Sequence, residues 1–439
     1  MIDYNPFAPE IRQNPYPHYA RLRRESPVLK LDPMGFWIVT RHEDVQTVLK
    51  SPQLFSSEAM AGPQGHESGY IPSIITMDPP VHGRYRSLVS RAFTPKMIAE
   101  LEPRIREITR ELTANAGRTS EFDVIGEVAL PLPVRVIAEM LGVEPARYSD
   151  FKRWSDLLVG QMMRQGAAPE QIAYETAENG AFNQYFRWTI QDRRRQPKND
   201  LISALVQAEV EGEHLTEDDI FSFAGLLLVA GNETTTNLLG NMVLALLSNP
   251  DQLARLIEDP SLIPAAVEET LRYDSPVQML FRFAREDVEL SGQIVPKGSL
   301  VWPVLGSANR DETRFPNPDR FDITRETNGH VAFGNGIHFC IGAPLARLES
   351  RIAIEEMLPH LATMKLPERS LEYIDAFFLR GLQRLPLITP EPVMASMPPS
   401  PMELARLIRA SGTALVKEGC AGVKTLLRRR LGRSDIGIL

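Results

Sequence analysis

Hydrophobic positions along the chain recur mainly at helical spacing. Intervals of three and four residues dominate from about 84 to 273, and a shorter helical pattern spans 343–358. Near the N-terminus, a short helical pattern at 16–25 precedes the strand-like run 36–40. Short runs rich in proline and glycine fill 275–336, and strand-like pieces follow the last helix. This pattern predicts a mostly α-helical fold with a small β part.

One predicted helix is much longer than the others. Thr216 is a suitable N-cap, and the three acids that follow it match the positive end of a helix. No helix breaker occurs until Asn249-Pro250, so the helix is expected over 216–248, a length of about 48 Å. Its middle, 223–231, is apolar on all sides, which predicts that this stretch is buried.

Polar residues follow directly after this apolar stretch. A buried carboxylate is costly unless it is paired or neutralised, so Glu233 requires a partner or a function. The hydroxyl of Thr234 can bond back to the carbonyl one turn earlier, and Gly231 weakens the same turn. The sequence leaves two interpretations open: a salt bridge to an arginine, or an acid and a hydroxyl that relay protons.

A glycine-rich segment at 333–342 surrounds Cys340 and runs into the helix that starts at residue 343. Glycines allow the backbone to approach a bulky group, and the N-terminal end of a helix favours a thiolate. A thiolate here is a metal ligand or a nucleophile with His338 as its base. A zinc site would need further cysteines or histidines at set spacing, which are absent. A lone cysteine is usually a buried apolar side chain, but the glycines argue against that interpretation.

Two further charged patterns have ordinary explanations. Glu269 and Arg272 lie three residues apart on one helical face, as in many surface pairs. His82 and Arg86 lie one turn apart near the start of a predicted helix, where they can hold an anion or face solvent.

Composition narrows the class of protein. The net charge of −8 argues against a nucleic-acid partner. Two cysteines in 439 residues do not form a disulfide framework, which favours a reducing compartment. The N-terminus has no signal-peptide pattern, and no apolar run reaches 18 residues. We therefore expect a cytoplasmic protein.

Taken in chain order, these features resemble the cytochrome P450 family, specifically its soluble bacterial members. The segment 333–342 has the form Phe-Gly-x-Gly-x-His-x-Cys-x-Gly, which is similar to the haem-ligand signature. Residues 230–235 resemble the family's oxygen-activating helix. Glu269 and Arg272, together with Arg320, resemble its structural charge triad, and the resemblance extends over about 5–392.

This resemblance implies a haem b between the long helix and the cysteine loop, with Cys340 as the iron ligand. Glu233 and Thr234 would deliver protons, and Glu269, Arg272 and Arg320 would hold the fold behind the haem. Four further residues would bind the haem propionates: His82, Arg86, Arg282 and His338. The other implied haem contacts are Ala230, Phe333, Gly334 and Gly342. The implied substrate pocket comprises Leu226, Val229, Val277, Met279, Phe377 and Phe378.

The family also implies a reaction and partners. The leading interpretation is a monooxygenase that hydroxylates or epoxidises an apolar small molecule, with electrons from NAD(P)H reaching it through a separate ferredoxin or flavodoxin and its reductase. A peroxygenase or isomerase, which needs no proton relay, and a haem sensor or carrier without turnover are the alternatives.

The C-terminal part departs from the family pattern. We expect a catalytic domain over 1–392, a proline-rich linker over 393–402 and a basic amphipathic extension over 403–439. The extension contains eight basic and three acidic residues. It either packs on the domain or binds an anionic membrane surface or the redox partner.

Overall fold

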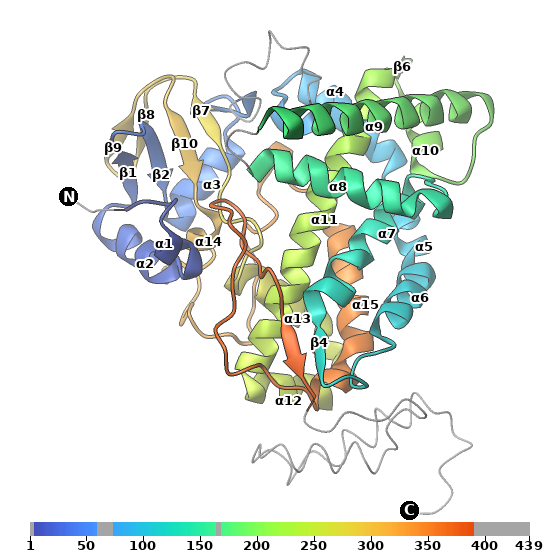
Figure 1. Ribbon diagram of the computed structural model, residues 1–439. Coiled ribbons are helices and arrows are strands. Elements are labelled where there is room, and N and C mark those ends of the chain that lie inside the picture. Colours follow the sequence, from blue (N-terminus) through green and yellow to red (C-terminus); the bar gives the residue numbers. More distant parts are fainter. Residues whose placement is uncertain (1–3, 59–72, 164–167, 390–439) are drawn as a thin grey trace, which may run out of the picture.

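The computed structural model describes residues 4–58, 73–163 and 168–389. A helical body occupies one side, and a smaller part with most of the strands lies beside it (Figure 1). The predicted mostly α-helical class is confirmed. The predicted linker at 393–402 and extension at 403–439 lie outside the described residues, so the domain boundaries stay predictions. Among the helices that the structure describes, none is long and apolar enough to cross a membrane.

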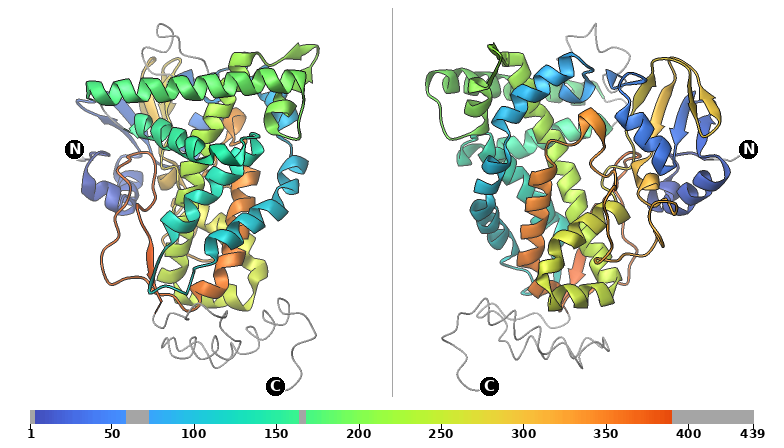
Figure 2. Two further views of the ribbon diagram at one scale, coloured as in Figure 1. Left: turned by 45° about the vertical axis from the view of Figure 1, so that its right-hand side comes forward. Right: turned by 180° about the vertical axis from the view of Figure 1, so that it is seen from behind.

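The body consists of helices arranged around one long central helix, α11, and the bounds of all of them, α11 included, follow. They are α4 (Val81–Ala92), α5 (Pro95–Glu100), α6 (Glu102–Thr113), α7 (Pro131–Met140), α8 (Tyr148–Met163), α9 (Pro169–Arg195), α10 (Leu201–Gln207), α11 (Glu217–Ser248), α12 (Pro250–Glu258), α13 (Ile263–Tyr273) and α15 (Ala343–Leu361). In Figure 2 the orange α15 lies beside the yellow-green α11, and the two helices are in contact. This pair forms the centre of the body.

Local signals set both ends of α11. The Thr216 hydroxyl accepts the N–H of Asp219 at 3.1 Å, and the Asp219 carboxylate accepts the N–H of Thr216 at 2.8 Å, which forms a capping box. Asn249 leaves the helical conformation, and Pro250 starts the next helix. Both predicted ends are therefore confirmed. Helix α15 continues three residues past its predicted end, through Pro359 to Leu361.

A glycine on α11 sets the distance to its neighbour α7. A Cβ added to Gly231 would lie 2.6 Å from Cδ1 of Ile137, closer than carbon atoms can approach. The absence of a side chain at this position therefore allows the two helices to pack tightly.

The β part is a five-stranded sheet in the order β1-β2-β10-β7-β3. Its strands are Val28–Leu31, Phe36–Val39, Leu300–Pro303, Arg282–Ala284 and Phe55–Ser56, in the same order. Strands β1 and β2 form an antiparallel hairpin, and β10 pairs with β2 in parallel, with Val301 opposite Trp37. Helices α1 (Pro9–Gln13), α2 (Tyr16–Glu25), α3 (His42–Lys50) and α14 (Leu305–Ala308) lie next to this sheet (Figure 1).

Three pairs of short strands complete the described β structure. They are β4 (Glu121–Asp123) with β11 (Pro386–Ile388), β5 (Glu209–Val210) with β6 (Glu213–His214), and β8 (Val288–Leu290) with β9 (Gln293–Val295). The first pair joins the end of the described chain to the helical body. Near its described end the chain therefore pairs with residues 121–123.

Candidate haem-thiolate site

Cys340 lies in a tight loop directly before α15. Its N–H donates to the carbonyl of Phe333 at 3.0 Å, which closes the loop. Gly336 has a φ of +69°, and a Cβ there would lie 2.5 Å from the carbonyl oxygen of Leu49 at the end of α3. A residue with a side chain is excluded at this position by the close backbone. At Gly336 the glycine is therefore required by packing against the end of α3, and the approach of a bulky group to the loop stays a prediction.

The surroundings of the sulfur act in opposite directions on its protonation. Burial raises the pKa of the Cys340 thiol above its usual value, whereas the N–H groups of Gly342 and Ala343 and the charge of Arg86 lower it. The expected effect of the helix N-terminus is present, but burial outweighs it. A bound cation at the sulfur would favour the thiolate further.

Two alternative roles of Cys340 lose support. Among the residues that the structure describes, no cluster of three or more histidine, cysteine or acidic side chains could hold a metal ion, so a zinc site has no ligands there. Nε2 of His338 lies 2.8 Å from the hydroxyl of Ser57, so this nitrogen already has a partner other than the sulfur. Its ring lies against His82, with ring centroids 4.3 Å apart. The assignment of Cys340 as a single thiolate ligand stays a prediction at this point.

Four basic side chains predicted to bind propionates gather beside this loop. They are His82 and Arg86 of α4, Arg282 of β7 and His338 of the cysteine loop. Burial, followed by the charges of Arg282 and His82, lowers the pKa of His338 to about 3. Burial also lowers the pKa of Arg282 to about 10. Groups whose charged forms are this unfavourable indicate that an anion belongs among them.

The acid nearest this basic cluster is already engaged. The Asp78 carboxylate accepts hydrogen bonds from the Ser56 hydroxyl and the Ser57 N–H and pairs with Arg285. Nε2 of His82 is buried without a hydrogen-bond partner among the described residues. An unsatisfied buried nitrogen beside buried cations fits the carboxylates of a haem. Sequence reasoning did not identify Ser57 or Asp78 as part of the site, because their roles depend on contacts across the fold.

One side of α11 is accessible in its middle. The residues on it are Leu226 and Val229, which are half-buried, Ala230, which is exposed, and Glu233 and Thr234, which are half-buried. They recur every three or four positions and therefore share one face. The prediction that this stretch is buried on all sides is wrong, because this face lacks the packing that covers the others. The accessible face carries both predicted proton donors.

The acid and the hydroxyl on this face have distinct environments. Thr234 Oγ1 donates to the carbonyl of Ala230 at 2.6 Å, as the sequence suggested. Burial and then the charge of Asp156 on α8 raise the pKa of Glu233. Asn232 donates to the Ser155 hydroxyl at 2.7 Å, which fixes this turn of α11 against α8. The described part of the chain places no lysine or arginine in an ion pair with Glu233, which disfavours the salt-bridge interpretation.

The predicted substrate-pocket residues divide into two groups. Leu226 and Val229 lie on the accessible face of α11, and Val277 is half-buried. Met279 is 1% exposed and belongs to the core near the N-terminal helices, so its assignment to a pocket wall is not supported.

Phe377 and Phe378 pack against the same core as Met279. The ring of Phe377 stacks on Trp302, with centroids 5.3 Å apart. Phe378 contacts Phe281 edge-on at 6.0 Å. Both phenylalanines are half-buried, so they support the sheet region and retain some accessible surface.

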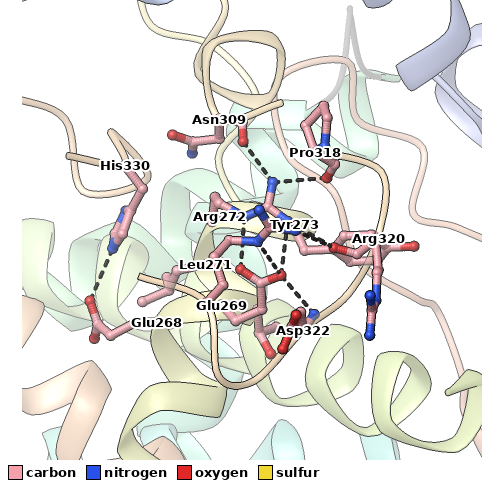
Figure 3. A network of polar contacts seen from close by, with 12 residues as sticks. Glu268, Glu269, Leu271, Arg272, Tyr273, Asn309, Pro318, Arg320, Asp322 and His330 are labelled. Atoms are coloured by element: carbon pink, nitrogen blue, oxygen red, sulfur yellow. Dashed lines mark hydrogen bonds and ion pairs between the residues drawn. The ribbon is translucent and has the colours of Figure 1, made fainter. Parts of the chain in front are cut away.

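The charge pair of α13 is fully buried. Arg272 donates to the Glu269 carboxylate through Nε at 2.7 Å and Nη2 at 2.9 Å, and both side chains are 0% exposed. Nη1 of Arg272 donates to the carbonyls of Asn309 and Pro318, each at 2.9 Å (Figure 3). The surface-pair interpretation is wrong, and the structural role implied by the family pattern fits this geometry.

The third member of this charge network differs from the prediction. Arg320 offers only its backbone carbonyl to Arg272, at 3.3 Å, and its exposed side chain extends away from Glu269 (Figure 3). Arg325 donates to Glu269 instead, from Nε at 3.2 Å. Carbonyls of the loop turn inward at Pro318 and Arg320, so the side chain of Arg320 points outward. The assignment of Arg320 as the third charge is therefore corrected to Arg325.

Comparisons with known proteins agree with this geometry. The family model "Cytochrome P450" matches residues 120–387. "Cytochrome P450 107B1" of Saccharopolyspora erythraea is 43% identical over 394 residues, which cover 85% of this chain and 95% of that protein. "Vitamin D(3) 25-hydroxylase" of Pseudonocardia autotrophica is 43% identical over 386 residues, with coverage of 85% and 94%. The solved structure of CYP109Q5 from Chondromyces apiculatus is 47% identical, has a TM-score of 0.81, and covers 88% of this chain and 98% of that one.

The molecule thus combines three features. They are the cysteine loop, a cluster of buried basic side chains that could bind an anion, and an accessible helix face with an acid and a hydroxyl. Relatives that match over nearly their whole length include bacterial hydroxylases and monooxygenases. Sequence motifs, fold and site geometry lead to the same conclusion: the chain belongs to the cytochrome P450 family of haem-thiolate monooxygenases.

Proposed function

We propose that the protein hydroxylates or epoxidises an apolar small molecule, using dioxygen and two electrons from a separate ferredoxin-type partner. The observation that carries this proposal is the acid–hydroxyl pair of Glu233 and Thr234 on the accessible face of α11. A haem b held by Cys340 would supply the activation of dioxygen. The residues of the chain would bind this group, exclude water and move protons. A peroxygenase, an isomerase or a haem sensor would have no need for this pair.

Protons would pass through the two side chains of this pair. Glu233 has a raised pKa, so its carboxyl can hold and release a proton closer to neutral pH than an exposed glutamate. Thr234 donates its hydroxyl hydrogen to Ala230 in the resting arrangement, which leaves oxygen lone pairs free to accept a hydrogen bond. Rotation of this hydroxyl would then turn it from the helix carbonyl toward the accessible side.

Thr234→Ala is expected to uncouple electron use from product formation. The variant removes the hydroxyl but keeps the helix, so haem content and substrate binding should stay near those of the parent. Product per NAD(P)H should fall about tenfold or more, within the usual range for loss of a proton-transfer group, and peroxide should rise. The measurement compares NAD(P)H consumed, product and peroxide. Thr234→Ser is the matched control, and equal coupling in Thr234→Ala and the parent would contradict the relay.

The substrate class follows from the accessible face. Its exposed and half-buried members near Glu233 are the apolar Leu226, Val229 and Ala230. An apolar wall with few polar groups suits an apolar or amphipathic molecule. The name of one relative gives vitamin D(3) as its substrate, which makes molecules of that size and polarity suitable first probes. Binding can be followed by the optical shift that a substrate causes in the haem spectrum.

Electron supply distinguishes the proposal from its alternatives. The 439 residues contain two cysteines, too few for a four-cysteine iron–sulfur cluster. Purified protein with a bound substrate and NADH or NADPH alone is therefore expected to give no product, and added ferredoxin with its reductase should restore turnover. Turnover by the purified chain alone would contradict a separate donor. Turnover with peroxide but not with ferredoxin would favour a peroxygenase, and binding without any turnover would favour a sensor.

A further inference from the structure

A second polar network lies behind the cysteine loop. Glu268 of α13 accepts two hydrogen bonds from Arg347 of α15, from Nε at 2.6 Å and from Nη2 at 2.8 Å. The same carboxylate faces Nε2 of His330 at 3.0 Å (Figure 3). His330 belongs to the segment that leads into the cysteine loop. The network therefore connects two helices to this segment.

Its hydrogen bonds define the protonation of the network. Nδ1 of His330 accepts the N–H of Ala332 at 3.3 Å, so the ring carries its proton on Nε2 and donates it to Glu268. Burial acts to raise the pKa of Glu268, but the hydrogen bonds from Arg347 and His330 lower it to about 2. Glu268 is therefore an anion that accepts hydrogen bonds from one guanidinium and one imidazole ring.

Arg347 connects this network to the cysteine loop. Its guanidinium lies over the ring of Phe333, 4.5 Å from the centroid, at a distance typical of a cation–π contact. The carbonyl of Phe333 accepts the N–H of Cys340. Contacts therefore run from Glu268 through Arg347 and Phe333 to the residue that would bind iron. The planar fork of arginine suits this arrangement, because it can bind a carboxylate with two nitrogens and stack on a ring at the same time.

We propose that Glu268, Arg347 and His330 form a brace that positions Phe333 and keeps the Cys340 sulfur on the haem iron. Arg347 is the positioning residue of this brace. The proposal rests on the proposed haem-thiolate function. The charge of Arg347 also interacts with Cys340. A positive charge on this side of the haem favours the reduced state, which carries one more negative charge than the oxidised state.

The test compares variants of purified, haem-loaded protein. The lifetime of the strongly red-shifted Soret band of the reduced carbon monoxide complex reports whether the thiolate stays on the iron. Arg347→Gln is expected to lose this band about tenfold faster than the parent, equivalent to about 1.4 kcal/mol of barrier. Its reduction potential should be more negative. Arg347→Lys keeps the charge without the two-nitrogen fork, so it should keep the parental potential but lose the band faster.

Arg351→Gln is the matched control. Arg351 lies one turn later on α15 and pairs with Glu102 and Glu355, whereas the ring contact to Phe333 comes from Arg347. The band of this variant should last as long as that of the parent. In band lifetime, Glu268→Gln should resemble Arg347→Gln, and the double variant should be no worse than either single one, because both changes weaken one interaction. The reduction potential of Glu268→Gln should not become more negative, because this change removes a negative charge.

Two outcomes would overturn the brace. The first is an equal lifetime of the red-shifted band in Arg347→Gln, Arg347→Lys and the control Arg351→Gln. The other is a weaker affinity of Arg347→Gln for ferredoxin with unchanged band lifetime and potential, which would make Arg347 a partner contact. A parent protein that lacks the red-shifted band would instead refute the haem-thiolate function itself, so the two failures are distinguishable.

Discussion

Replacement of Cys340 with serine is expected to abolish the strongly red-shifted Soret band that the reduced protein gives with carbon monoxide. Serine retains the size of the side chain but replaces a polarisable thiolate with a hydroxyl that does not ionise in this environment. The loop should persist, because its closing hydrogen bond uses the backbone N–H of residue 340. Product formation should fall to background with the band.

Cys420→Ser is the control for this experiment. Cys420 is the second cysteine of the chain and lies outside the described residues. Its replacement should leave the band and the turnover of the parent unchanged. A Cys340→Ser protein that still shows thiolate ligation, or a Cys420→Ser protein that loses it, would refute the assignment of Cys340.

Features governed by local sequence were predicted well. The ends of α11 follow from Thr216 and from Asn249-Pro250, since capping and proline effects act within a few residues. The positive φ of Gly336 is also a local property, whereas its close contact with the backbone of Leu49 comes from a distant segment and was not predicted. The haem contacts came from a family pattern, and the side chains at 82, 86, 282 and 338 do lie in one region in this structure.

Features governed by contacts distant in sequence were predicted less well. Arg320 and Arg325 lie in the same loop, and their sequence positions do not reveal which side chain turns toward Glu269. Met279 was assigned to a pocket from its position after α13, but the path of the chain places it in the core near the N-terminal helices. The outcome at both positions depends on the direction in which an irregular segment faces.

The brace shows the same limit more clearly. Its three members come from α13, α15 and the segment before the cysteine loop, and each is unremarkable within its own sequence neighbourhood. Glu268 was not assigned a role from the sequence, because the family motif includes only its neighbour Glu269. Charge pairing across helices depends on side-chain packing. It therefore became visible only after the helices were placed.

Arg272→Ala is expected to yield almost no haem-loaded protein. The change leaves the Glu269 carboxylate buried without its main partner and removes hydrogen bonds to the carbonyls of Asn309, Pro318 and Arg320. Loss of one partner from a buried ion pair costs about 3–5 kcal/mol, a large part of the roughly 5–15 kcal/mol by which domains are stable. The loop that covers α13 would lose its attachment to the helix.

Neighbouring arginines provide graded controls for this result. Arg320→Ala should load haem like the parent, because its interaction with Arg272 uses the backbone carbonyl, which alanine retains. Arg325→Ala should load less haem than Arg320→Ala but more than Arg272→Ala. In this variant Glu269 loses Arg325 but keeps its hydrogen bonds with Arg272 and with the N–H of Asp322. The measurements are the ratio of haem to protein after identical purification and the denaturant midpoint. Normal loading in Arg272→Ala would remove the structural role of this pair, and a loss in Arg320→Ala as severe as in Arg272→Ala would restore Arg320 as its third charge.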